Sequence, residues 1–174
     1  MTEYRRRVDQ ILDPSFVVDL DSIDLDELRS RKKVADEVET ELSYYRRLLH
    51  GRLDLLAFEM RRRAGKETRS LIEALPEVLG AGEKGEGGRS RFPTVFAPDL
   101  PDSRRRHIDH VLRDDFLSRL PVIGDEELGD IRETLAETEA GISSSRRDVQ
   151  KVVDALHAEL VRRYKDDASD LTVL

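Results

Sequence analysis

Five polar residues form a pattern that occurs twice in this chain, one hundred positions apart. Each copy holds a glutamate, a serine, an arginine, an imidazole or amide, and an aspartate. The copies are Glu39, Ser43, Arg46, His50 and Asp54, and Glu139, Ser143, Arg146, Gln150 and Asp154. Internal repeats usually retain the apolar residues that packing requires. A repeat that retains polar groups indicates a shared binding task, in which arginine donates hydrogen bonds and the carboxylates accept them.

The spacing of the pattern places its side chains on one strip of an α-helix. Successive residues advance by about 100°, so offsets of 0, 4, 7, 11 and 15 fall within an arc of about 80° and span about 22 Å. The apolar stripe of the same helix is centred roughly 80° to one side. Each polar strip therefore borders the buried seam of its helix without entering it.

Two long helices are expected to carry these strips. Residues 23–65 and 123–166 each have apolar residues at spacings of three, four or seven, which is typical of an amphipathic helix. The two segments also match outside the pattern, for example at Leu56/Leu156 and Arg63/Arg163, without a slip of register. The predicted fold is all-α: a long antiparallel helical hairpin, or coiled coil, made from an internally duplicated helix. An approximate twofold axis would bring both strips to one face.

The remaining segments are expected to be extensions and a connection. Residues 1–22 form an N-terminal extension, whose short apolar stretch at 15–20 is a candidate for docking to a partner. Residues 66–122 are expected to be a flexible linker, because the stretch from Gly80 to Ser90 is rich in glycine, with a short amphipathic helix near 103–120. Residues 167–174 are expected to be a C-terminal tail.

Composition fits long, exposed helices better than a thick globular core. Charged residues make up 39% of the chain, hydrophobic residues make up 38%, and the mean hydropathy is −0.57. A net charge of −7 argues against direct DNA binding. The chain has no cysteine, which excludes disulfides and thiolate chemistry. No stretch approaches the ~20 apolar residues of a membrane span, and no signal peptide is recognisable, so we expect a cytoplasmic protein.

Two matching polar strips would suit a ligand that is itself symmetric. Arginine can fork onto O6 and N7 of guanine or onto a phosphate, and a carboxylate can accept from guanine N1–H and N2–H. Cyclic di-GMP presents two guanines and two phosphates with twofold symmetry. The competing interpretation is a purely structural hairpin, whose charges form helix pairs worth about 0.2–0.5 kcal/mol. The serines and aspartates argue against it, because neither residue favours a helix interior.

The pattern E-x3-S-x2-R-x3-[QH]-x3-D, present once on each helix of an antiparallel coiled coil, resembles the signature of the RsiG family. The resemblance covers residues 25–65 and 125–165. RsiG proteins are actinobacterial anti-sigma factors that bind cyclic di-GMP and hold the sporulation sigma factor WhiG inactive. The resemblance implies that the ten pattern residues contact two intercalated cyclic di-GMP molecules and that a monomeric hairpin sequesters a WhiG-type sigma factor in a 1:1 complex. His50 departs from the glutamine of the pattern, although imidazole also donates or accepts a hydrogen bond.

Two other classes of function fit the sequence less well. One is a coiled-coil adaptor or homodimer that senses a cyclic dinucleotide without a sigma partner, but two patterns in one chain favour a monomer. The other is an enzyme. His107 and His110 have a spacing compatible with metal binding, yet they adjoin an arginine run typical of a helix surface. Gly85–Gly88 lacks the lysine and the serine or threonine of a phosphate-binding loop. We expect no catalytic residues and no metal.

Overall fold

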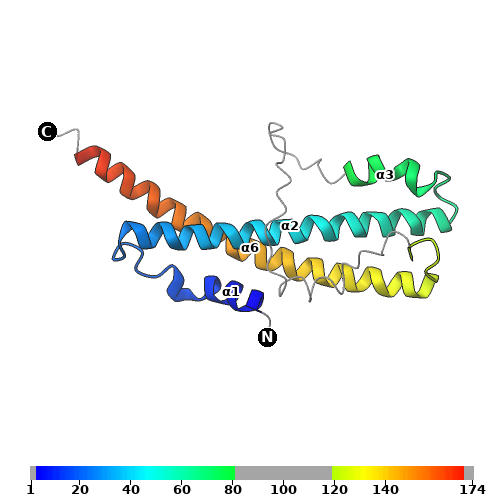
Figure 1. The fold of residues 1–174 in the computed structure, drawn as a ribbon, viewed down its shortest axis with the longest axis horizontal. Coiled ribbons are helices and arrows are strands. Elements are labelled where there is room, and N and C mark those ends of the chain that lie inside the picture. The colour runs from blue at the N-terminus through cyan, green and yellow to red at the C-terminus, as the bar shows by residue number, and fades with distance from the viewer. Residues whose placement is uncertain (1–2, 81–118, 171–174) are drawn as a thin grey trace. The chain divides into compact units, whose positions relative to one another are not determined.

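The protein is built from helices. A computed structural model describes residues 3–80 and 119–170, and the regular elements of this part are all helical (Figure 1). They are α1 (Glu3–Leu12), the 3-10 helix η1 (Pro14–Phe16), α2 (Leu25–Arg63), α3 (Leu71–Gly80) and α6 (Asp125–Asp170). The prediction of an all-α fold with two long helices is confirmed, although α6 continues four residues beyond the predicted end at 166.

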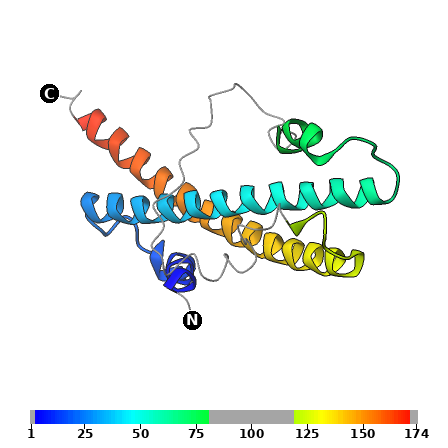
Figure 2. The same cartoon turned by 45° about the vertical axis from the view of Figure 1, so that its right-hand side comes forward.

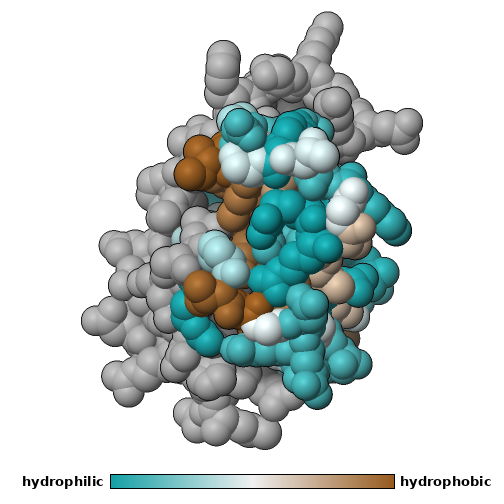
Figure 3. Space-filling view, turned by 90° about the vertical axis from the view of Figure 1, so that its right-hand side faces the viewer, coloured by the Kyte–Doolittle hydropathy of each residue, from teal (hydrophilic) through white to brown (hydrophobic). Residues whose placement is uncertain are grey.

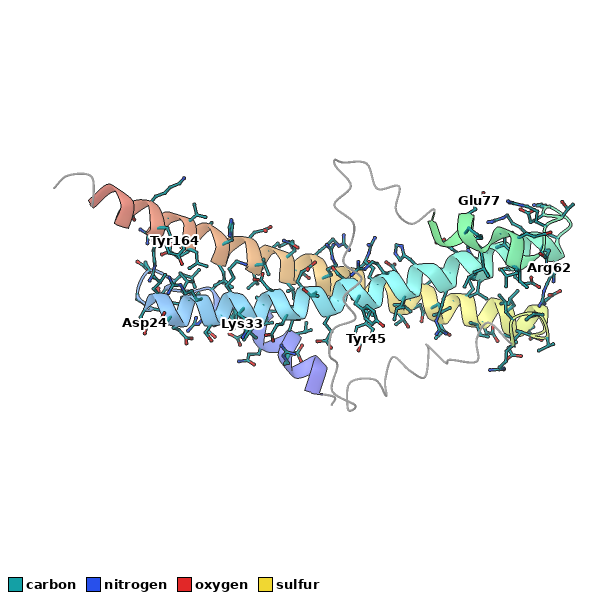
Figure 4. All side chains as sticks on the ribbon, turned by 45° about the horizontal axis from the view of Figure 1, so that its top comes forward. Asp24, Lys33, Tyr45, Arg62, Glu77 and Tyr164 are labelled. Carbon is teal, nitrogen blue, oxygen red and sulfur yellow. The ribbon has the colours of Figure 1, made fainter. Side chains whose placement is uncertain are left out.

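The two long helices pack against each other in antiparallel orientation. The chain forms two compact units, one of Met1–Ser43 with Ser143–Leu174 and the other of Tyr44–Ile142. In the first unit the beginning of α2 lies beside the end of α6, and in the second the end of α2 lies beside the beginning of α6 (Figures 1 and 2). In the first unit Arg29 Nη2 on α2 donates to the hydroxyl of Tyr164 on α6 at 2.8 Å. Figure 4 shows Tyr164 at the same end of the helix pair as Asp24, which immediately precedes α2.

A heptad repeat supplies the core between the long helices. On both helices every seventh position is buried, and the corresponding residues are Leu28, Ala35, Leu42, Leu49 and Leu56, and Leu128, Leu135, Ile142, Val149 and Leu156. A seven-residue period keeps an apolar seam facing the partner helix. Burying one such leucine fully contributes about 1.5–3 kcal/mol. The seam, rather than intrinsic helix propensity, therefore accounts for two such long helices in so polar a chain.

The start of α2 is fixed by a capping aspartate. The backbone N–H of Glu27 donates to Asp24 Oδ1 at 2.7 Å, which satisfies one of the free donors of the first turn. Asp24 immediately precedes α2 and occupies the cap position. In α6 the equivalent position is Gly124, whose carbonyl accepts from Leu128 N at 2.9 Å.

Within the second unit, the last residue of α2 binds the segment that precedes α6. Arg63 Nη1 donates to the carbonyl of Ile123 at 2.7 Å, and Nη2 donates to the carbonyl of Leu120 at 3.0 Å. Arg63 Nε also lies 2.8 Å from Oε1 of Glu59, a carboxylate on the same helix that is almost fully buried. We call this arrangement an arginine clasp. It fixes the path by which the chain enters α6.

A second arginine clasp forms within the first unit, one hundred residues later. Arg163 Nη1 donates to the carbonyl of Ile23 at 2.8 Å, and Nη2 donates to the carbonyl of Leu20. Glu159 lies 2.8 Å from Arg163 Nε. Hydrogen bonds from Arg162 and Arg163 lower the pKa of Glu159 to about 2. The two clasps show that the local contacts repeat as the sequence does.

The N-terminal extension packs on α2 within the first unit. Val8 and Ile11 of α1 are buried, at 6% and 1% exposure. Arg7 Nη2 forms an ion pair with Glu37 Oε2 at 3.1 Å, and its Nη1 lies 3.8 Å from Glu41 Oε2. The extension predicted for residues 1–22 therefore includes a helix, α1, that was not predicted from the sequence.

The connection between the long helices begins with a helix rather than a linker. In α3 the N–H and hydroxyl of Ser70 donate to Glu73 Oε2 at 2.8 and 2.9 Å, and Glu73 N donates back to Ser70 Oγ at 3.3 Å. This reciprocal pair is a capping box, which starts a helix where we expected flexible chain. The glycine-rich stretch at 81–90 lies outside the described residues. So does the helix expected near 103–120, except for Arg119 and Leu120, which are described.

On the face that Figure 3 shows, the described residues are mostly hydrophilic, with hydrophobic residues in small separate patches. The exposed large hydrophobic residues of the described part are Val18, Leu48, Ile72, Val122 and Tyr164. None of the described helices combines the length and apolar character needed to cross a membrane.

Candidate functional site

The first group of pattern residues joins α2 to α6 inside the first unit. Arg146 Nε on α6 donates to Ser43 Oγ on α2 at 2.7 Å and lies 3.0 Å from Glu39 Oε1. Ser43 Oγ in turn donates to Glu39 Oε1 at 2.8 Å. These three side chains therefore close a ring of two hydrogen bonds and one ion pair. The side chains of Arg146 and Glu39 are 34% and 21% exposed, so the ring borders solvent.

The second group lies inside the second unit, with its arginine on α2, its glutamate on α6, and a histidine in place of the serine. Arg46 Nε on α2 lies 3.6 Å from Glu139 Oε1 on α6. His50 Nε2 lies 2.7 Å from the same oxygen. An ionised carboxylate only accepts hydrogen bonds, so we assign the Nε2 proton to His50 as the donor. Arg46 and His50 are 39% and 41% exposed, whereas Glu139 is 19% exposed.

The remaining pattern residues lie on the same two helices. Gln150 Nε2 donates to Asp154 Oδ1 at 3.0 Å, four residues along α6. Gln150 therefore bonds within its own helix, whereas His50 at the matching position reaches across to α6. Ser143 and Asp54 occupy partly buried positions on α6 and α2. Nine of the ten predicted residues are partly buried, Asp154 is exposed, and none belongs to the buried core.

The glutamate-to-arginine spacing explains why each arginine meets a glutamate of the other copy. Glu39 and Arg46 are seven residues apart on α2, as Glu139 and Arg146 are on α6. Seven residues are two helical turns, which return a side chain to nearly the same face. In the antiparallel register of these helices, the arginine of one copy therefore faces the glutamate of the other. Sequence reasoning placed these residues on strips but did not predict this crossed pairing.

Chemically, each group offers a guanidinium and a carboxylate in direct contact at the edge of the seam. Such a pair presents hydrogen-bond donors and acceptors side by side. The guanidinium can donate to a phosphate or to the acceptor atoms of a base edge, and the carboxylate can accept from N–H donors of a base. The groups could bind a polar, anionic ligand with several donors and acceptors. A second possibility from the sequence, the His107–His110 pair as metal ligands, lies outside the described residues.

The fold defines a class of helical protein in which two long amphipathic helices pair, with one arginine–glutamate group between α2 and α6 in each unit. The family model described as RsiG-like matches residues 14–79 and 114–174, which together make up most of the chain. The chain therefore belongs to the RsiG-like family. Membership fits a regulator rather than an enzyme, and it suggests an anti-sigma factor whose partner is a sigma factor. No curated protein matches the chain.

Proposed function

We propose that this protein is an anti-sigma factor that binds cyclic di-GMP through its two pattern groups and sequesters a WhiG-type sigma factor. The observation that carries the proposal is the crossed pairing of Arg146 with Glu39 and of Arg46 with Glu139. Two equivalent groups, each supplying one guanidinium and one carboxylate, suit a ligand that presents the same chemistry twice. Cyclic di-GMP does so, with two guanines and two phosphates.

In each group the arginine and the glutamate would have complementary roles. The arginine would bind a phosphate oxygen or the O6 and N7 atoms of guanine. The glutamate would accept from N1–H and N2–H of a guanine, and serine and aspartate would supply further hydrogen bonds. Two ligand molecules, intercalated by base stacking, would use all ten residues: Glu39, Ser43, Arg46, His50, Asp54, Glu139, Ser143, Arg146, Gln150 and Asp154.

The existing ion pairs do not prevent such a ligand from binding. Ion pairs that border solvent contribute only about 0.2–1 kcal/mol. Hydrogen bonds to charged groups contribute about 1.5–3 kcal/mol each when they form in a more desolvated site. A phosphate that replaces Glu39 as the partner of Arg146 therefore gains more than the pair loses.

Sequestration would follow from linkage between the ligand and the sigma factor. If cyclic di-GMP binds the complex better than it binds the free chain, the sigma factor must bind the liganded chain better by the same factor. High cyclic di-GMP would hold the sigma factor inactive, and a falling concentration would release it. This would place developmental, sporulation-linked transcription under control of the nucleotide.

Calorimetric titration with cyclic di-GMP tests the ligand assignment. We expect Arg46→Ala and Arg146→Ala to weaken binding by about 10- to 100-fold each, as the loss of about 1.5–3 kcal/mol implies. Arg47→Ala and Arg147→Ala are matched controls, since these exposed neighbours lie outside the pattern and should change affinity less than about twofold. Wild-type affinity in Arg146→Ala, or an equal loss in the controls, would contradict the assignment.

Co-purification with a WhiG-type sigma factor, with and without cyclic di-GMP, tests the partner. We expect a ligand-dependent 1:1 complex, and light scattering should report a monomer for the chain alone. A ligand-induced homodimer without sigma binding would favour the alternative of a nucleotide-sensing adaptor.

A further inference from the structure

The two copies of the polar pattern differ at one position, where His50 stands opposite Gln150 in the repeat. The glutamates of the two groups are almost equally accessible, since the side chain of Glu139 is 19% exposed and that of Glu39 is 21% exposed. Burial therefore does not distinguish the two carboxylates. Their hydrogen-bond partners do, and the residue that departs from the pattern is one of these partners.

In the first unit the residue at this position does not engage the glutamate. Gln150 Nε2 donates to Asp154 Oδ1 at 3.0 Å, along its own helix. Glu39 Oε1 instead has Ser43 Oγ at 2.8 Å and Arg146 Nε at 3.0 Å, two residue types that both copies of the pattern contain. Among the described residues, Gln150 thus bonds an aspartate of α6 and leaves the carboxylate on α2 to the serine and the arginine.

In the second unit the imidazole takes hold of the glutamate. His50 Nε2 lies 2.7 Å from Glu139 Oε1, which is a hydrogen-bond distance. Arg46 Nε lies 3.6 Å from the same oxygen, which is too far for a hydrogen bond, whereas the matching distance in the first unit is 3.0 Å. His50 is therefore a closer partner of Oε1 than the arginine of its own group.

A ligand that uses Glu139 has to displace this hydrogen bond. In the binding mode proposed above, the carboxylate accepts N1–H and N2–H of one guanine, and two parallel bonds of this kind need both of its oxygens. Oε1 is the oxygen that His50 holds. Only the fraction of molecules in which His50 has let go is ready to bind, and the apparent affinity falls by that fraction.

We propose that His50 competes with cyclic di-GMP for Glu139 and thereby raises the ligand concentration that the protein requires. This inference rests on the proposed function and concerns the regulation of the same site. Once displaced, the imidazole can still bond the ligand through a ring nitrogen, so His50 remains a contact of the bound state. A hydrogen bond at a site this open weakens ligand binding by roughly 3- to 10-fold.

The repeat itself suggests the variant that removes the competitor. Asp54 follows position 50 by four residues, as Asp154 follows Gln150. In His50→Gln the new amide should therefore bond Asp54 along α2, as Gln150 bonds Asp154 along α6. Glu139 would then be released to the ligand. We expect calorimetric titration of the full chain with cyclic di-GMP to show roughly 3- to 10-fold tighter binding in this variant.

Two further variants test whether the effect belongs to this contact. Gln150→His brings an imidazole to the position from which it can reach Glu39, so it should weaken binding by a similar factor, roughly 3- to 10-fold. His157→Gln is the matched control, because His157 is an exposed histidine of α6 outside the pattern. It should change the affinity by less than about twofold.

Nitrogen NMR of the imidazoles gives a readout that does not depend on affinity. The His50 signals, identified by their loss in His50→Gln, should shift when cyclic di-GMP saturates the wild-type chain, because Nε2 leaves Glu139. Signals that stay unchanged at saturation would refute the displacement.

The outcomes separate this inference from the proposed function. Unchanged or weaker binding in His50→Gln, while the wild type binds, would overturn the competition and leave the proposed function standing. An equal gain in His157→Gln would overturn it as well. If neither the wild type nor His50→Gln binds cyclic di-GMP, the proposed function fails and the competition fails with it.

Discussion

The arginine clasps predict a large and specific loss of stability when the clasp arginine is removed. In Arg63→Ala the carbonyls of Leu120 and Ile123 lose a charged donor at 3.0 and 2.7 Å. A hydrogen bond to a charged group contributes about 1.5–3 kcal/mol. The Arg63 side chain is 21% exposed, so water can partly replace it, and the two bonds share one side chain. We therefore expect a loss of about 2–4 kcal/mol in the free energy of unfolding.

A neighbouring arginine provides a matched control for this estimate. Arg62 also pairs with Glu59 at 2.8 Å, but its side chain is 41% exposed and holds no carbonyl of the segment before α6. Arg62→Ala leaves Glu59 paired with Arg63 and both carbonyls bonded, so it should cost less than Arg63→Ala, about 1–2 kcal/mol. Arg63→Lys keeps the charge but cannot span two carbonyls with a fork, so it should recover less than half of the loss.

Urea unfolding followed by helical circular dichroism measures these differences, provided that the slope with denaturant stays constant. The same comparison applies in the other unit, where Arg163→Ala should cost more than Arg162→Ala. If Arg63→Ala and Arg62→Ala agree within about 0.5 kcal/mol, which is the usual range for surface substitutions, the clasp has no special weight and the reasoning fails.

Three further outcomes follow from the same contacts. The pKa of Glu159 in the folded state is about 2, below its ordinary value of 4.5. The stabilisation from Glu159 is therefore complete above pH 4.5 and is lost as the pH falls toward 2. When the free energy of unfolding is measured against pH, Glu159→Gln should flatten the curve between pH 4.5 and 2. Asp24→Ala should lower the free energy of unfolding by about 1 kcal/mol through loss of the α2 cap, whereas Gly124→Asp should gain only a few tenths in the same denaturation assay, because glycine is itself an acceptable cap. Leu49→Ala should lower the free energy of unfolding by about 2–5 kcal/mol and Leu48→Ala by far less, because Leu49 is fully buried and Leu48 is 37% exposed. Comparable losses for the two variants in urea unfolding would disprove the heptad seam.

The long helices were predictable because one strong periodic signal defines them. Leu28, Leu42, Leu49 and Leu56 keep one face buried over the length of α2. This burial outweighs the low helix propensity of Gly51, the glycine inside α2. Asp24 stands just before the periodic stretch, where a helix cap is expected, and the structure uses it.

The short helices were missed for different reasons. In α1 a run of arginines obscures a short apolar pattern whose members, Val8 and Ile11, become buried only against α2. The start of α3 had a local signal in the Ser70-x2-Glu73 capping box, but the glycine-rich stretch from Gly80 to Ser90 led to the prediction of a linker. Short helices depend on tertiary packing, which a single sequence does not reveal.

The composition of the candidate site could be predicted, but not its pairing. Helical spacing alone places Glu39 and Arg46 on one strip of α2. Which residue faces Arg46 depends on the register between the two helices, and a heptad repeat permits several registers that differ by seven residues. The structure selects the register in which Arg46 meets Glu139 and Arg146 meets Glu39.

The two kinds of repeated contact have different physical explanations. The clasps retain Arg63 and Arg163 at matching positions, and stability is a sufficient reason. Each arginine bonds two backbone carbonyls and pairs with a glutamate on its own helix. That glutamate is almost fully buried in the first case and largely buried in the second. The pairs of Arg46 and Arg146 border solvent, where an ion pair contributes about 0.2–1 kcal/mol and many other side chains would serve as well. Stability therefore does not account for a repeated set that also includes serine and aspartate, whereas the ligand proposed above would account for it.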